Sequence, residues 1–224
     1  MGAWMELREA VRQCSECQGL VGVLFVDFQS EWPHLPEPPT QPVLFISEAP
    51  PMDGGFWAIQ PPGKRKDGLR GNVLDFLNID PAHEPAGLEE FVGAGLYLIQ
   101  SFQRPLKFSV AGLSADQRKE MLQHQVHAHL KPQIDYMAPR AILALGETAA
   151  TAVSLVFPAS SFSHMFERGG FRATKGQIIA EEGVPLLSAT YLPAGPSAGF
   201  FKRSWQAGFQ AFLDRAKEVR SLSD

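Results

Sequence analysis

The chain has 224 residues, 45% of them hydrophobic, which suits one α/β domain covering residues 1–224. Its formal net charge of −4 gives no overall positive field that would attract nucleic acid, so any such contact needs a local basic patch. We expect a cytoplasmic protein that does not enter the membrane, because no apolar run approaches the roughly 20 residues of a membrane helix and the N-terminus lacks a signal-peptide layout.

The first half of the chain alternates apolar segments with proline-rich or basic connections. We predict an amphipathic helix over 5–13, a hairpin or edge strand over 20–28, and a first core strand over 43–47. A connector with five prolines over 32–42 precedes that strand. A long loop over 53–71 carries a basic cluster, and a short helix follows over 72–78.

The second half of the chain contains three further predicted strands, over 96–101, 141–145 and 185–191. A long helix is expected over 114–137, with Ser114 as its cap and Pro132 breaking or kinking it. The turn at Gly146 leads directly into another helix, and a terminal amphipathic helix covers 200–219.

Four short parallel strands with helical crossovers predict an α/β fold, a three-layer sandwich whose central four-stranded parallel sheet has the order 2-1-3-4. In that order the direction in which successive strands are added reverses between the first and third strands. Ligands of open α/β sheets bind at the carboxyl ends of the strands beside this point. We therefore expect Glu48, Gly146 and the segment 190–193 to meet in one crevice.

Glu48 stands where the apolar run Val43–Ile46 stops, and Pro50 and Pro51 hold the chain extended after it. A continuous apolar run is typical of a parallel strand buried on both faces. The carboxylate is then fixed at the carboxyl edge of the sheet as a candidate active-site group. The alternative is a surface glutamate in an ordinary turn.

Five motifs follow one another along the chain. They are Ile46-Ser47-Glu48-Ala49-Pro50-Pro51, Gly71-Asn72-Val73-Leu74-Asp75-Phe76-Leu77, Leu96-Tyr97-Leu98-Ile99-Gln100 with Arg104-Pro105, Pro139-Arg140-Ala141-Ile142-Leu143-Ala144-Leu145-Gly146, and Thr190-Tyr191-Leu192-Pro193-Ala194 after Arg168-Gly169. Together they resemble the motifs of the uracil-DNA glycosylase superfamily, particularly its family-four enzymes. The resemblance implies a monomer that binds DNA with a flipped base and hydrolyses the N-glycosidic bond of uracil or another deaminated or damaged base.

The resemblance also implies roles for particular residues. Glu48 would direct water, Gln100 would read the base, and Ser47, Ala49 and Leu192 would line the base pocket. Phe56 and Trp57 are the nearest aromatic residues for stacking, although they could equally close their loop onto the core. The implied DNA contacts, which could also be a solvated charged face, are Lys64, Arg65, Lys66, Arg70, Pro193, Lys202 and Arg203.

Two further positions leave alternatives open. Phe200 and Phe201 follow the last strand and could fill the hole left by a flipped base, or pack under the last helix. Glu147 is more simply a first-turn residue that favours the helix dipole than a catalytic group.

Two departures from the motifs bear on catalysis. Leu192 stands where the family has a histidine that stabilises negative charge on the departing base, and Ser47 stands where it has glycine. Loss of one such donor costs roughly 10²–10³-fold in rate. The alternative function is therefore a nucleic-acid-binding relative that keeps the base pocket and has lost the chemistry.

Family-four enzymes hold an iron–sulfur cluster with four cysteines, and this chain has only Cys14 and Cys17, with Gln103 and Val126 at the later positions. We expect no cluster and no metal or other cofactor. Zinc would require histidines to join the two thiols.

His124 and His127 share a helix face at i, i+3, near His129, and we interpret all three as part of a solvated face. The chain also lacks the Gly-x-Ser-x-Gly elbow of hydrolases and the glycine fingerprint of dinucleotide-binding proteins.

Overall fold

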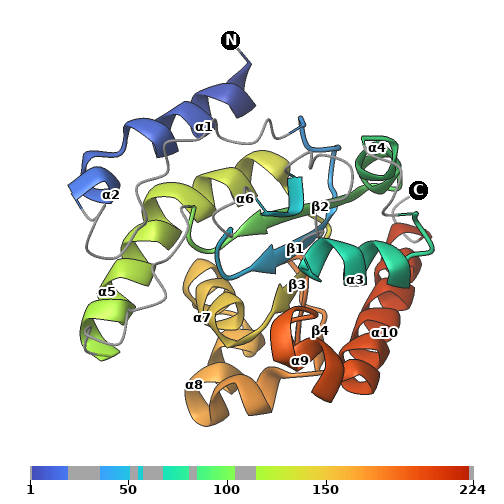
Figure 1. The fold of residues 1–224 in the computed structure, drawn as a ribbon. Helices are drawn as coiled ribbons and strands as arrows, with labels where there is room; N and C mark the ends of the chain where they lie inside the picture. The colour runs from blue at the N-terminus through green and yellow to red at the C-terminus, as the bar shows by residue number, and fades with distance from the viewer. Residues whose placement is uncertain are drawn as a thin grey trace.

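The computed structural model describes residues 2–19, 36–50, 55–57, 68–80, 85–103 and 115–221. Its centre is a mixed five-stranded sheet with the order β2-β1-β3-β5-β4 (Figure 1). The strands are β1 (Val43–Ser47), β2 (Leu96–Gln100), β3 (Ala141–Leu145), β4 (Ile178–Ile179) and β5 (Leu186–Thr190). β1 pairs in parallel with β2 and β3, and β3 pairs in parallel with β5.

The α/β class is confirmed, but the sheet has one strand more than the four parallel strands expected. The additional strand, β4, has two residues and runs antiparallel to β5. A two-residue strand has no periodic pattern, so the sequence gives no signal for it. The four longer strands are buried at every position, which accounts for the continuous apolar runs of β1 and β3.

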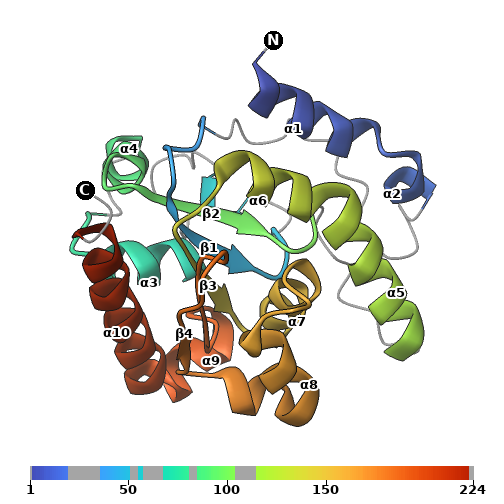
Figure 2. The same cartoon turned by 180° about the vertical axis from the view of Figure 1, so that it is seen from behind.

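Helices lie on both sides of this sheet (Figures 1 and 2). Phe45 of β1 packs against Phe91 of α4 (Ala86–Gly93) and stacks on Phe209 of α10 (Lys202–Ser221), with ring centroids 6.0 and 5.0 Å apart. Phe76, in α3 (Gly68–Phe76), also packs on Phe209. α10 approaches β5 so closely that a Cβ atom at Gly208 would lie 2.7 Å from Thr190 Oγ1. The end of β5 is therefore held firmly against α10.

The N-terminal helix α1 (Ala3–Gln13) lies outside α6 (Lys131–Met137), and α2 (Ser15–Gly19) lies toward α5 (Ala115–Gln125), as Figures 1 and 2 show. Trp4 anchors α1: its ring is stacked on Tyr136 of α6 and meets Tyr97 of β2 edge-on. Arg8 Nη1 donates to Gln103 Oε1 at 3.0 Å. Burial lowers the pKa of Arg8 to about 10 and raises the pKa of Tyr97 above its usual range.

The expected long helix over 114–137 consists of three parts: α5 (Ala115–Gln125), the π-helical segment η3 (Val126–Leu130) and α6. The N–H of Lys131 donates to the carbonyl of Val126, five residues back. Pro132 lies in the first turn of α6 and has no N–H to donate, so the α-helical ladder is interrupted here. The proline therefore changes the helix type rather than ending the helix.

The remaining helices are η1 (Gly55–Trp57), α7 (Glu147–Val156), α8 (Ser161–Thr174) and α9 (Gly195–Phe200). The hairpin or edge strand expected over 20–28 lies outside the described residues. Of the helices in the described part of the chain, none combines the length and the apolar character needed to cross a membrane.

Candidate functional site

The carboxyl ends of the parallel strands form one continuous edge. Ser47 is paired in register with Gln100, and the N–H of Phe102 donates to the carbonyl of Glu48 at 2.8 Å. On the other side, the N–H of Gly146 donates to the carbonyl of Thr190, also at 2.8 Å. Backbone hydrogen bonding thus continues past the strand ends and fixes the loops that begin there. This edge is the candidate functional site.

Glu48 lies exposed at the centre of this edge. Its Oε1 accepts a hydrogen bond from Thr148 Oγ1 at 3.0 Å. Thr148 is in the first turn of α7, where the helix dipole favours a nearby negative charge. The carboxylate is therefore held beside a helix N-terminus and lies open to solvent. Thr148 was not predicted, because a threonine beside Gly146 gives no sequence signal beyond a helix start.

Three of the expected pocket residues lie next to Glu48: Ser47 and Ala49 flank it in the chain, and Gln100 of β2 is in register with Ser47. Ser47 and Gln100 are 2% and 8% exposed, and Ala49 is half-buried. Ser47 Oγ has no hydrogen-bond partner among the described residues. A buried hydroxyl without a partner is uncommon in a folded protein, because it loses its hydration and gains no bond.

Leu192 lies across the edge from Glu48's strand, packed beside Gly146. A Cβ atom at Gly146 would lie 3.5 Å from Leu192 Cβ, and the φ of Gly146 is +93°. Glycine is therefore required here for the backbone conformation. Leu192 is half-buried and offers no hydrogen-bond donor from its side chain.

Phe56 and Trp57, considered above for stacking on a base, are core residues in this structure. They are 1% and 4% exposed, and both pack against Phe91. Trp57 Nε1 donates to the carbonyl of Leu98 in β2, the edge strand of the sheet. Both rings thus pack in the core, as the alternative interpretation held.

Arg70, expected at the DNA surface, is fully buried in α3. Its Nη1 donates to the carbonyl of Phe56 at 3.2 Å, which joins α3 to η1. The expectation of a surface contact is wrong for this residue in this structure, because its guanidinium does not reach solvent. The other basic residues of that loop, Lys64, Arg65 and Lys66, lie outside the described residues.

The segment after β5 borders the site. Pro193 is buried, and its carbonyl accepts from Asn72 Nδ2 at 2.9 Å, so α3 holds this segment in place. Lys202 and Arg203, at the start of α10, are exposed as expected. Phe200 is 87% exposed, whereas Phe201 stacks on Tyr191 with ring centroids 4.1 Å apart. One of the two aromatics is therefore free to contact a partner.

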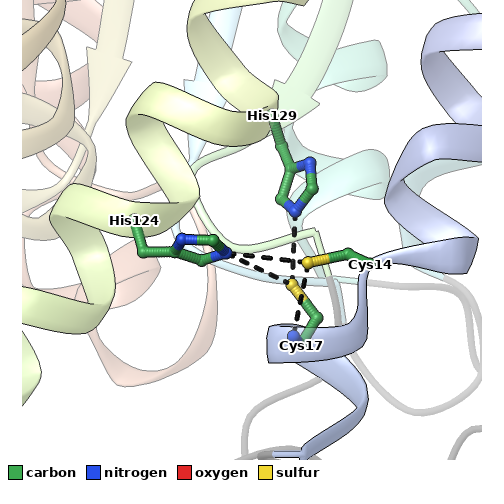
Figure 3. Close-up of side chains that lie close together, drawn as sticks. All are labelled: Cys14, Cys17, His124 and His129. Carbon is green, nitrogen blue, oxygen red and sulfur yellow. Dashed lines mark hydrogen bonds between the residues drawn. The ribbon is translucent and has the colours of Figure 1, made fainter.

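A second group of side chains lies apart from the sheet edge. Cys14 and Cys17, between α1 and the end of α2, face His124 and His129 (Figure 3). The ligand atoms of all four lie within 4.8 Å of one another. The interpretation of all three histidines as a solvated helix face is confirmed only for His127, which is exposed; it is wrong for His129, which is buried, and His124 is half-buried. The π-helical segment η3 turns His129, five residues after His124, toward the cysteines instead.

Comparison with protein-family models and with curated proteins gives no match for this chain. The interpretation of its function therefore rests on its own residues and their geometry.

Proposed function

We propose that this protein is a DNA glycosylase of the uracil-DNA glycosylase type, which hydrolyses the N-glycosidic bond of uracil or another deaminated or damaged base. The observation that carries the proposal is Glu48, an exposed carboxylate at the carboxyl edge of β1, beside the nearly buried Ser47 and Gln100. The proposal includes the fold: a three-layer sandwich in which β2, β1, β3 and β5 form the central parallel sheet.

Glu48 supplies the chemistry in this proposal. Cleavage of an N-glycosidic bond leaves positive charge on the sugar, which a nearby carboxylate stabilises. The same carboxylate accepts a proton from the attacking water as general base. The hydrogen bond from Thr148 Oγ1 occupies one oxygen of Glu48 and orients the carboxylate, leaving the other oxygen for water.

Ser47 and Gln100 would recognise the base. Enzymes of this class extrude the target nucleotide into a pocket and read its Watson–Crick edge by hydrogen bonds. The amide of Gln100 both donates and accepts, and the hydroxyl of Ser47 lacks a partner among the described residues. Two polar groups of this kind, on adjacent strands and in register, can form hydrogen bonds with neighbouring atoms of one base.

The exposed residues after β5 would hold the DNA. Lys202 and Arg203 lie at the start of α10, next to Phe200, and both are exposed. Cations at this position suit phosphate contacts, which orient the duplex without reading its sequence. An exposed aromatic ring between them and the strand ends suits insertion at the position of the extruded base.

Leu192 favours a second candidate function, DNA binding without base excision. Its side chain has no donor to stabilise negative charge on a departing base. In that case the pocket would hold a base without releasing it.

An assay of base release separates the two functions. The purified protein, in excess, is incubated with single- and double-stranded oligonucleotides that carry uracil, hypoxanthine or xanthine. Alkaline cleavage at the abasic site then reports release. Release from any of these substrates supports the glycosylase. Binding of the modified oligonucleotides without release would support the second function, and neither binding nor release would contradict both.

Replacing Phe200 with alanine is expected to reduce base release from duplex substrate about tenfold, because stacking against a base contributes roughly 1–3 kcal/mol. Release from single-stranded substrate should change little, because a single strand has no base stack in which the ring must take the place of the extruded base. The side chain is 87% exposed, so the variant should fold normally. Equal losses on both substrates would contradict insertion into the duplex.

A further inference from the structure

We propose that Cys14, Cys17, His124 and His129 bind one zinc ion as a tetrahedral Cys₂His₂ site. The proposed base excision does not use this site, and from the sequence we expected no metal. The thiols come from the N-terminal helices and the imidazoles from α5 and η3, more than a hundred residues later, and all four point to a common centre (Figure 3).

The distances fit a single ion. His124 Nε2 lies 3.6 Å from Cys14 Sγ and 4.0 Å from Cys17 Sγ, and His129 Nε2 lies 3.2 Å from Cys17 Sγ. Zinc–sulfur bonds of about 2.3 Å and zinc–nitrogen bonds of about 2.0 Å place sulfur and nitrogen about 3.5 Å apart in a tetrahedron. These three sulfur–nitrogen distances lie within about 0.5 Å of that tetrahedral value.

The donor set selects zinc. Tetrahedral sites with two sulfur and two nitrogen ligands are typical of zinc or of iron–sulfur centres. An iron–sulfur cluster with two cysteines and two histidines places the cysteines on one iron and the histidines on the other. Here each imidazole lies within 4.0 Å of a cysteine sulfur, so two irons with bridging sulfides do not fit between them. Two thiolates also balance the charge of one Zn²⁺ ion.

Second partners orient His124, Cys17 and Cys14. Glu16 Oε2 accepts from His124 Nδ1 at 2.6 Å, which is the carboxylate–histidine arrangement of many zinc sites and directs Nε2 to the metal. Gln125 Nε2 donates to Cys17 Sγ at 3.0 Å, and the N–H of Cys17 points to Cys14 Sγ at 3.3 Å. Donors directed at sulfur stabilise thiolates, the form that binds zinc.

The site joins distant parts of the chain. Gln125, which contacts Cys17, also accepts from the backbone N–H of Gln103, and the side chain of Gln103 donates to the carbonyl of Gln100. Hydrogen bonds thus connect the cysteines to the end of β2. A bound ion would fasten the N-terminal helices to α5 and support the strand end that carries Gln100.

Metal analysis of the full chain tests the proposal. We expect about one zinc per chain after purification under reducing conditions and equilibration with zinc. Cobalt(II) should replace it and give the absorption of a tetrahedral, sulfur-ligated ion, a readout on the unaltered protein. Absence of bound metal after incubation with zinc, or the presence of iron with acid-labile sulfide, would overturn the proposal.

Two exposed or half-exposed positions allow variants that should fold. His124→Ala is expected to lower zinc affinity at least 100-fold, because it removes a ligand. Glu16→Gln should lower zinc affinity about tenfold, the smaller of the usual losses when a residue that hydrogen-bonds a ligand is replaced. His127→Ala, on the same helix but exposed, is the matched control and should bind zinc as the unaltered chain does. Equal losses in His127→Ala and His124→Ala would contradict the assignment. These readouts do not depend on base release, so the two proposals fail separately.

Discussion

Replacing Glu48 with glutamine is expected to lower the rate of base release about 10²–10⁴-fold, the usual contribution of a positioned general base. The amide can still accept a hydrogen bond from Thr148, but it cannot take a proton from water or carry the negative charge that stabilises the sugar cation. Single-turnover release from the preferred oligonucleotide, at enzyme excess, measures this step. Binding of the same oligonucleotide should change little.

Glu147→Gln is the matched control for Glu48→Gln. Glu147 is an exposed carboxylate at the same sheet edge, in the first turn of α7, and the substitution removes the same charge. We expect a rate within about threefold of the unaltered chain, because surface charges are largely screened. Full activity of Glu48→Gln, or an equal loss in both variants, would remove Glu48 from the mechanism.

The strands could be predicted because a strand buried on both faces requires a continuous run of apolar residues, which can be recognised in the sequence. Val43–Ser47 and Ala141–Leu145 were placed with their observed bounds, since an apolar run that ends at a charged or glycine residue marks both ends of such a strand. The edge at which Glu48 and Gly146 lie follows from the direction of these strands. β4 was not predicted because a strand of only two residues, which pairs with β5, is too short to show a periodic pattern.

The side-chain environments were harder to predict. A basic residue near a crevice suggests a phosphate contact, yet Arg70 is turned inward by its position on α3 and binds the carbonyl of Phe56. Likewise, His124 and His129 do not share a face of an ideal α-helix. They meet at the cysteines because a π-helical segment, next to Pro132, changes the rotation per residue. Such effects depend on tertiary packing, which a local pattern does not record.

Replacing Trp4 with alanine is expected to lower the free energy of unfolding by about 3–5 kcal/mol, as for other large buried aromatic residues. Trp4 is 2% exposed, stacks on Tyr136 and meets Tyr97 edge-on, so its loss opens a cavity under α1. Urea denaturation followed by circular dichroism measures the change. Met5→Ala, one residue away and 45% exposed, is the control and should change stability by less than about 0.5 kcal/mol.

The same substitution links stability to the proposed zinc site. Cys14 and Cys17 follow α1 directly, so a loosened α1 holds them less often beside His124. Since 1.4 kcal/mol corresponds to about tenfold in affinity, a loss of roughly 3 kcal/mol in docking would weaken zinc binding by up to about 100-fold. Trp4→Phe should retain most of both properties, because the indole Nε1 has no hydrogen-bond partner among the described residues. Unchanged zinc affinity in Trp4→Ala would mean that the cysteines are positioned independently of α1.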